Sequence, residues 1–266
     1  MEKDVEMVGE GASLEIQIDA YLKELESKSR MKKNHLTHHK VNPYYRAKMV
    51  DWMIEVLNSF KCADQTFFLA VSIMDRYFNE MNTAKTGIAL HDLHAIGVVS
   101  MFIASKYEDI YPLLMKTIHH KIAHQKISVD KIKTWEVEIL QALHFKVGAS
   151  SSPMDFIENY LEQIMPAQHQ DKQFIHVMSL YLAKMALHHT KFCTLRSSVI
   201  STIAIYVAFK ICEQMRKKEI MTLQMFADLI RVSHAEETYV VECSKTLLYL
   251  AQHFEDELPG LSNLRS

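Results

Sequence analysis

Two hexapeptides in the middle of the chain, Met101-Phe-Ile-Ala-Ser-Lys106 and Ile205-Tyr-Val-Ala-Phe-Lys210, decide the architecture that we predict. They match each other at an offset of 104 residues, and the stretch around the first is apolar on nearly every helical face. A helix of this kind is surrounded by other helices. The sequence therefore predicts two central helices, over 91–109 and 195–214.

A second pair of segments repeats in the same order. Glu138-Ile-Leu-Gln-Ala-Leu-His-Phe145 matches Leu247-Leu-Tyr-Leu-Ala-Gln-His-Phe254 at an offset of 109 residues. Two five-helix domains related by duplication explain both matches, and chance similarity among Leu- and Ala-rich helices is the alternative. Gly148-Ala-Ser-Ser-Ser-Pro153 interrupts the helical pattern and marks the boundary. We predict domains over 43–148 and 149–255, with a leader, helix and linker in 1–42 and a tail in 256–266.

The remaining apolar periodicity predicts helices throughout the chain. Residues 14–30 form an amphipathic helix, and the basic, His-rich stretch 31–42 is interpreted as a linker. We expect Asp64 and Ser128 to cap the helices that follow them, and Pro112 to end the first central helix. The other expected helices are 44–60, 64–81, 114–121, 128–143, 154–165, 170–188, 222–231 and 235–252.

Composition excludes several classes of protein. The 266 residues contain 6 Gly and 5 Pro, too few for the many tight turns of an all-β fold. A net charge of −2 argues against a strong electrostatic grip on nucleic acid. The four cysteines form no CxxC pair, which is typical of a reducing compartment. The apolar run between Arg196 and Lys210 is shorter than the roughly 18 residues that span a membrane. We expect an all-α intracellular protein, nuclear or cytoplasmic, with no membrane segment and no signal peptide.

Four charged residues lie on or beside apolar helical faces. Glu136 falls inside the apolar arc of 128–143, and Lys106 lies in one row with Val99 and Phe102. Each charge either pairs within the molecule or awaits the backbone groups of a partner. Arg46 and Asp75 also flank apolar positions, and we expect them to form an ion pair within the first domain.

Around these charges the sequence resembles the cyclin box. The resemblance is carried by Arg46-Ala-Lys-Met-Val-Asp-Trp-Met-Ile-Glu-Val56, Leu69-Ala-Val-Ser-Ile-Met-Asp-Arg-Tyr-Phe78 and Ala104-Ser-Lys-Tyr-Glu-Asp-Ile-Tyr-Pro112. The order and spacing of these blocks are similar to those of mitotic cyclins of the A/B group, and the similarity covers about 14–255. It implies two tandem five-helix cyclin-box domains preceded by an N-terminal helix.

The resemblance also implies a function and its residues. A cyclin forms a heterodimer with a cyclin-dependent protein kinase and activates it, without catalytic residues, cofactor or metal of its own. Lys106 and Glu136 match the pair with which the family grips the C-helix region of the kinase. The neighbouring kinase-contact positions match Tyr107, Glu108, Leu140, Phe145 and Val147. Arg46 and Asp75 match a structural ion pair of the family.

One part of the chain departs from the family pattern. The patch that docks substrates and inhibitors usually begins with Met-Arg-Ala-Ile-Leu and includes a glutamine. The matching residues here are Tyr45, Lys48, Met49, the retained Trp52 and, at the glutamine position, His94. Because Lys48 replaces an apolar residue, we expect docking of Arg-x-Leu peptides to be weak or altered.

Alternative functions remain open at this point. A cyclin fold can serve as a kinase-independent scaffold, or as the nucleic-acid-binding core of a general transcription factor, which usually has a basic face and a zinc ribbon. His35/His39 and His120/His124 have the i, i+4 spacing of metal ligands, but without an HExxH pattern. The sequence contains no GxSxG and no phosphate-binding GxxxxGK[ST], so we expect no enzyme.

Overall fold

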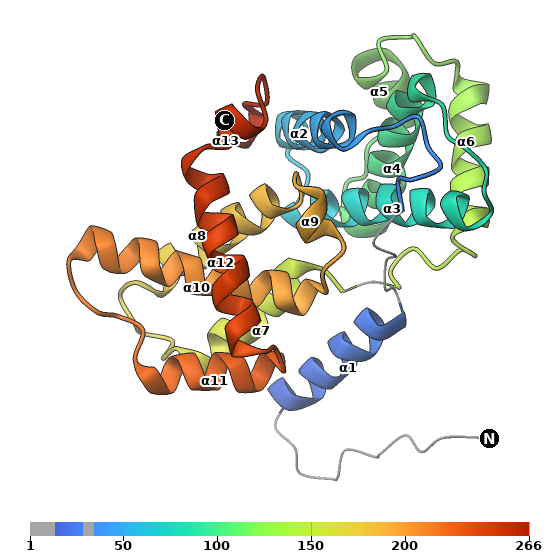
Figure 1. Cartoon of the computed structure of the whole chain (residues 1–266). Helices are drawn as coiled ribbons and strands as arrows, with labels where there is room; N and C mark the ends of the chain where they lie inside the picture. Colours follow the sequence, from blue (N-terminus) through green and yellow to red (C-terminus); the bar gives the residue numbers. More distant parts are fainter. Residues whose placement is uncertain (1–13, 29–34, 150, 266) are drawn as a thin grey trace.

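The computed structural model describes residues 14–28, 35–149 and 151–265, and these ranges contain helices and no β-strand. The predicted all-α fold, with two tandem domains after an N-terminal helix, is confirmed (Figure 1). The N-terminal helix is α1 (Leu14–Lys28). The first domain contains α2 (Pro43–Ser59), α3 (Asp64–Thr83), η1 (Leu90–Asp92), α4 (Leu93–Glu108), α5 (Met115–Thr117), the π-helical turn η2 (Ile118–Ile122) and α6 (Val129–Ala142). The second contains α7 (Pro153–Ile164), α8 (Lys172–Ala186), α9 (Thr190–Cys193), α10 (Ser197–Arg216), α11 (Leu223–Ser233), α12 (Glu237–Gln252), α13 (Phe254–Glu257) and η3 (Asn263–Arg265).

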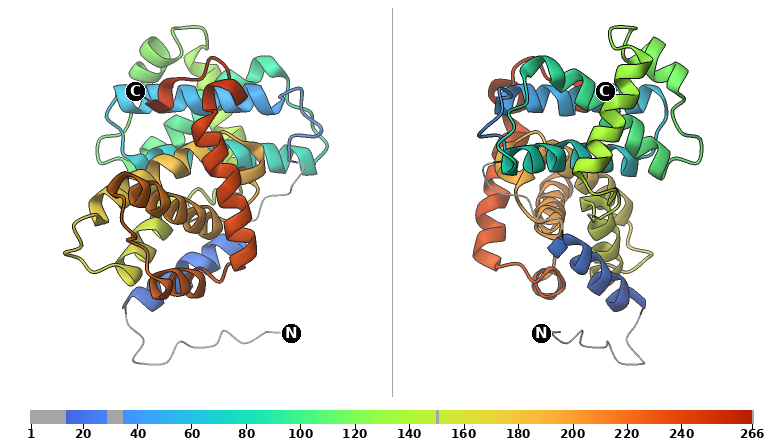
Figure 2. Two further views of the ribbon diagram at one scale, coloured as in Figure 1. Left: turned by 60° about the vertical axis from the view of Figure 1, so that its left-hand side comes forward. Right: turned by 90° about the vertical axis from the view of Figure 1, so that its right-hand side faces the viewer.

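The two repeated hexapeptides lie in the central helices of the domains. In the first domain, α4 packs against α2, α3 and α6, and every residue from Ala95 to Ser105 is buried. In the second domain, α10 packs against α7, α8, α11 and α12 (Figure 2). Of the described helices, α10 is the one that is long and apolar enough to span a membrane by length and composition, and 67% of its apolar window is buried. That burial is typical of the central helix of a bundle.

Helix ends follow local side-chain chemistry. Ser128 caps α6 as predicted, because its hydroxyl accepts a hydrogen bond from the Lys131 amide at 3.2 Å. The prediction for Asp64 is wrong, since Ala63 occupies the N-cap position of α3 and Asp64 instead pairs with Lys184 at 2.6 Å. The first central helix ends at Glu108, one residue before the predicted end at Asp109, and Pro112 lies beyond that end as expected.

Asp109 ends α4 by adopting an extended backbone and binding three donors. Its carboxylate accepts hydrogen bonds from the Ala63 amide at 3.0 Å and from the hydroxyls of Thr66 and Ser105 at 2.7 Å. Burial alone would raise the pKa of Asp109, but these hydrogen bonds lower it below its ordinary value. Asp109 therefore joins the end of α4 to the start of α3.

We expect Asp109→Asn to destabilise the fold at neutral pH by about 1–3 kcal/mol, because a charge-assisted acceptor is lost. A lowered folded-state pKa stabilises the fold above the unfolded-state pKa, and this contribution disappears as the pH falls through the folded-state value. The difference between wild type and variant should therefore shrink below about pH 4. Denaturant unfolding at several pH values measures it, with the exposed Asp256→Asn as control. A difference that stays constant down to pH 2 would contradict this assignment.

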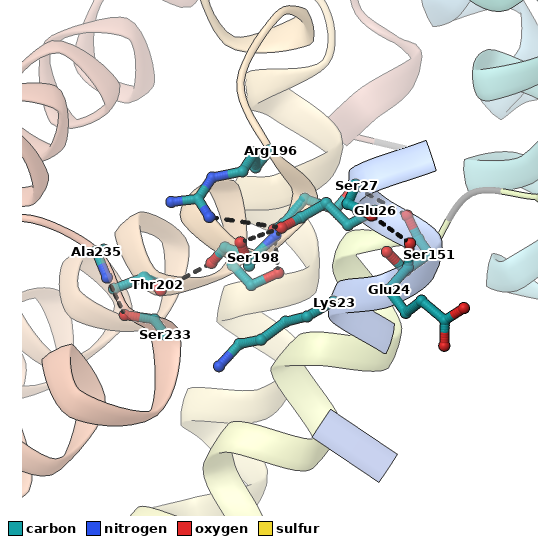
Figure 3. A network of polar contacts seen from close by, with 12 residues as sticks. Lys23, Glu24, Glu26, Ser27, Ser151, Arg196, Ser198, Thr202, Ser233 and Ala235 are labelled. Atoms are coloured by element: carbon teal, nitrogen blue, oxygen red, sulfur yellow. Dashed lines mark hydrogen bonds and ion pairs between the residues drawn. The ribbon is translucent and has the colours of Figure 1, made fainter. Parts of the chain in front are cut away.

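Glu26 attaches α1 to the second domain (Figure 3). Its carboxylate is 6% exposed and accepts hydrogen bonds from the Ser198 amide at 2.7 Å and the Ser198 hydroxyl at 2.8 Å. Ser198 lies in the first turn of α10, where amides lack helical partners and the helix dipole favours a negative charge. Lys23 adds a hydrogen bond to the Val232 carbonyl, so α1 is held at two points.

We expect Glu26→Ala to release α1 from α10, because the Ser198 amide then loses its partner. The expected cost is about 1–3 kcal/mol, seen as faster hydrogen exchange across 14–28. Glu24→Ala is the matched control, since Glu24 is exposed and pairs only with Lys28 of the same helix in the described contacts. Equal exchange in the two variants would show that Glu26 does not anchor α1.

The described part of the predicted linker is packed against the first domain. His35 and Val41 are buried, and the His39 ring contacts the Phe78 carbonyl at 2.9 Å and the Ile88 amide at 3.1 Å. Residues 35–41 therefore belong to the body of the first domain. The part of the predicted linker that the structure describes is thus held in place, because buried side chains and the His39 ring attach it to α3 and to Ile88.

The chain end folds back onto the first domain as a C-terminal strap, residues 258–265 (Figures 1 and 2). Leu261 and Leu264 are buried, and the Asn263 side-chain amide donates to Asp51 of α2 at 2.9 Å. His188, which directly follows the C-cap of α8, lies 3.7 Å from the same carboxylate. Burial alone would raise the pKa of Asp51, but His188 and the hydrogen bonds from the strap lower it. One carboxylate thus joins α2, α8 and the strap.

Candidate functional site

Lys106 and Glu136 lie side by side on the surface of the first domain. Lys106 is in the last turn of α4 and Glu136 is in the middle of α6, and their side chains form an ion pair. The Lys106 ammonium also lies 4.0 Å from the centre of the Phe102 ring. The two side chains are 39% and 17% exposed. The pair is thus made within the molecule, but a partner can reach it.

Partial burial changes the chemistry of this pair. The pKa of Lys106 is lowered by desolvation, because apolar neighbours disfavour the ammonium form. An exposed ion pair contributes only about 0–1 kcal/mol to stability. The ion pair therefore adds little to the free energy of unfolding of the isolated chain. Both groups can leave each other for hydrogen-bond partners on another protein at a small cost in free energy.

Exposed apolar side chains surround the pair. Among the positions expected to contact a kinase, Tyr107 is 58% and Phe145 is 67% exposed, while Glu108, Leu140 and Val147 are partly buried. Gly148 lies against the Tyr107 ring, so a larger residue there would displace it. Burial, and secondly the nearby carboxylates of Asp155 and Asp109, raise the pKa of Glu108. The structure brings these predicted residues onto one face around the ends of α4 and α6.

Three further apolar residues follow α4 and were not predicted from the sequence. Ile110 is 89%, Tyr111 is 91% and Leu114 is 68% exposed. Clustered large apolar side chains in solvent mark protein-binding surfaces. The sequence does show these three apolar residues close to Pro112, just after a predicted helix. A loop has no helical periodicity, however, so the sequence cannot indicate which of its apolar side chains are exposed.

The predicted ion pair of Arg46 and Asp75 lies in the interior. The Arg46 Nε donates to Asp75 Oδ1 at 2.6 Å, Nη2 donates to Oδ2 at 2.5 Å, and Nη1 donates to the Leu187 carbonyl at 2.7 Å. Burial alone would lower the pKa of Arg46, but the Asp75 carboxylate raises it above its ordinary value. The pair joins α2 to α3, and Arg46 also reaches the second domain, which the sequence did not indicate.

The predicted docking residues lie along α2 and the start of α4. Tyr45 and Lys48 are exposed, and the half-buried rings of Trp52 and His94 have centroids 5.2 Å apart. Met49 is instead buried beside Gly97, so it contributes to the core and not to the surface. The surface at this position is aromatic and basic.

The histidine pairs singled out by their spacing do not form a metal-binding cluster. No group of three or more His, Cys, Asp or Glu side chains with the geometry to hold a metal ion occurs in the described ranges. His35 lies 4.0 Å from Asp75, while His39 contacts backbone groups of Phe78 and Ile88.

A cleft of about 290 Å³ lies between the two domains and under α1. Leu22 and Leu25 of α1, Phe68 of α3 and Ile200 of α10 line it, together with Tyr107 and Glu108 at the end of α4. The cleft thus adjoins the surface that carries Lys106 and Glu136.

Comparison with known proteins assigns both domains to one family. Residues 17–148 match the family model "Cyclin, N-terminal domain" and residues 151–258 match "Cyclin, C-terminal domain". A "G2/mitotic-specific cyclin-B" of Dictyostelium discoideum is 27% identical over 245 residues, 92% of this chain and 51% of the relative. A cyclin-B of Emericella nidulans is 31% identical over 73% of this chain and 38% of the relative. The chain spans about half the length or less of these two relatives.

The fold has a solved counterpart. The X-ray structure of a viral cyclin from herpesvirus saimiri matches with a TM-score of 0.72 and 18% identity, over 94% of this chain and 100% of the viral chain. The resemblance to mitotic cyclins that the sequence suggested is confirmed. Since the two family models together cover nearly the whole sequence, this chain belongs to the cyclin family.

Proposed function

We propose that this chain binds a cyclin-dependent protein kinase as its regulatory subunit and activates it in cell-cycle control. Membership of the cyclin family supports the proposal. The observation that carries it is the partly exposed Lys106–Glu136 pair on the surface that also carries the exposed side chains of Tyr107 and Phe145. In this proposal the chain itself performs no catalysis and needs no cofactor.

The pair offers complementary chemistry to a partner backbone. An ammonium donates hydrogen bonds to carbonyl groups, and a carboxylate accepts them from N–H groups. In the free protein the two groups satisfy each other. On binding, each turns to a main-chain group of the kinase, while Tyr107, Leu140 and Phe145 bury apolar surface around them.

Activation then follows from selective binding. A protein kinase is active when the glutamate of its αC helix pairs with the lysine of strand β3. A partner that binds only the inward αC position raises the population of that state. A shift from 1:99 to 99:1 requires about 5.5 kcal/mol of differential affinity. A few buried aromatic anchors and charge-assisted hydrogen bonds are sufficient to supply this difference.

Capture from lysate of the source cell tests the proposal. Wild-type chain should retain a protein kinase activity, and Lys106→Ala/Glu136→Ala should retain little or none. Circular dichroism and thermal unfolding of the variant establish that it is folded. If folded wild type captures no kinase activity, the chain is a kinase-independent scaffold and the proposal is wrong.

We further propose that this cyclin docks Arg-x-Leu peptides weakly. Lys48 is exposed on the same helix as Tyr45 and Trp52, so its ammonium repels the arginine of such a peptide. Lys48→Ile should strengthen binding, as measured by fluorescence anisotropy with a labelled peptide. Binding of ordinary strength that does not change in Lys48→Ile would contradict this expectation.

A further inference from the structure

A concentrated positive charge lies at one end of the first domain. Residues 116–133, here called the basic segment, contain five lysines, three histidines and one acidic residue, Asp130. Its formal charge is +4, although the chain as a whole carries −2. The segment comprises α5, the contacting turn η2 and the start of α6, and α5 and α6 are labelled in Figure 1.

The lysines of the basic segment are exposed to solvent. All five are exposed, and none forms an ion pair with any part of the chain that the structure describes. They are Lys116, Lys121, Lys126, Lys131 and Lys133. Like charges that are held together without counter-charges create a local positive potential that attracts an acidic partner.

A rigid turn presents this charge. Two consecutive residues, His124 and Gln125, have left-handed backbone conformations with φ of 48° and 60°. Such residues cost about 1–2 kcal/mol each unless their surroundings hold them. Here the Gln125 amide donates to the His119 carbonyl at 2.8 Å, and Ile122 and Ile127 are buried on either side. Because the turn is fixed, a partner that binds it orders little of this backbone.

The turn lies close to the aromatic surface on α2, because η2 packs against α4, whose first turn carries His94, and α4 also packs against α2. The pKa of His94 is lowered first by burial and then by the positive charges of Lys126 and His124. His94 in turn contacts Trp52, and Lys48 is exposed on the same helix as Trp52. The basic segment, Lys48, Trp52 and His94 therefore form one surface, which we call the basic docking face.

We propose that the basic docking face binds an acidic segment of a partner protein, with an apolar residue of that segment packed against Trp52. The charge complementarity requires an anionic ligand, and the half-buried aromatic pair supplies a site for an apolar anchor. A polypeptide fits better than nucleic acid, because the residues outside the basic segment sum to −6 and would repel an extended phosphate backbone. The proposal goes beyond the regulatory role above and does not depend on a kinase.

Fluorescence anisotropy with the purified full chain and three labelled peptides tests this. The peptides carry a central leucine flanked by Glu and Asp, by Gln and Asn, or by Arg and Lys. The acidic peptide should bind about tenfold or more tightly than the neutral one at low salt, and the basic peptide should not bind. The preference should decrease as ionic strength rises to about 0.15 M.

Charge reversal locates the site. Lys121→Glu/Lys126→Glu should weaken binding of the acidic peptide at least about tenfold, since each reversal replaces an attraction by a repulsion. The matched control is Lys217→Glu/Lys218→Glu, which makes the same change at exposed positions of the second domain and should have less than about twofold effect. Circular dichroism verifies that both variants are helical.

Three outcomes would overturn the proposal. Equal binding of the acidic and neutral peptides would show that charge does not select the ligand. An equal loss in the two double variants would place binding elsewhere or reduce it to net charge. Tighter binding of a single-stranded oligonucleotide than of the acidic peptide would assign the face to nucleic acid.

Discussion

Arg46→Met should lower the free energy of unfolding by about 3–5 kcal/mol, which is the largest stability effect that we expect from a single substitution in this chain. Arg46 is fully buried, and its three hydrogen bonds satisfy Asp75 and the Leu187 carbonyl. Methionine fills a similar volume but leaves the buried Asp75 carboxylate without the arginine that donates two hydrogen bonds to it. The chain either unfolds or protonates that carboxylate, and both cost free energy.

A double substitution separates the ion pair from packing. Replacing both partners of a buried pair by apolar residues is often neutral, so Arg46→Met/Asp75→Leu should recover most of the stability that either single variant loses. Urea unfolding monitored by circular dichroism measures the four proteins of the cycle. A loss below about 1 kcal/mol in Arg46→Met would show that the pair has little energetic role.

Exchanging the charges of the surface pair, Lys106→Glu/Glu136→Lys, should abolish kinase binding and leave the fold intact. The exchange retains an ion pair between α4 and α6, so the free energy of unfolding should change by less than about 0.5 kcal/mol. Kinase N–H groups that donate to Glu136 in wild type would then face the ammonium of a lysine, and kinase carbonyl groups that accept from Lys106 would face a carboxylate. Breaking such contacts costs about 2–5 kcal/mol, which corresponds to at least about a 30-fold loss of affinity.

Exchanging the two charges distinguishes a kinase-binding role from a structural role better than removing them does. If the pair served only to hold the two helices together, the exchanged variant would bind a kinase like wild type, because the internal contact persists. Surface plasmon resonance with the kinase recovered by capture gives the affinity. The matched control is Asp228→Arg/Arg231→Asp, which exchanges the charges of a surface ion pair on α11 and likewise leaves the net charge unchanged. Binding within about threefold of wild type would remove Lys106 and Glu136 from the proposed interface.

The features that could be predicted from the sequence were those that the helical periodicity of apolar residues reveals. The two central helices were found because a segment that is apolar on every face must be surrounded by other helices. Lys106 and Glu136 were found because each charge interrupts an apolar stripe. Asp64 was misread because a residue that suits an N-cap also suits the first turn of a helix, where its negative charge is favourable.

Contacts between distant segments were outside the reach of these patterns. Glu26 and Ser198 are 172 residues apart, and Asp51 and Asn263 are 212 residues apart. No local spacing connects such partners, since only the folded backbone brings them together. The basic segment was overlooked for a different reason, because the charge was summed over the whole chain and the local excess in 116–133 cancelled against acidic residues elsewhere.

The C-terminal strap also has a consequence for biosynthesis. Its Asn263 and Leu264 bind Asp51, a residue of the first helix of the first domain. During translation α2 leaves the ribosome more than 200 residues before these partners exist. Before the strap is synthesised, the Asp51 carboxylate therefore lacks the hydrogen bonds from Asn263 and Leu264, and His188 is its remaining partner among these contacts. A nascent chain that stalls before Asn263 leaves this carboxylate undersatisfied and the neighbouring apolar surface uncovered, a state that chaperones can distinguish from the finished protein.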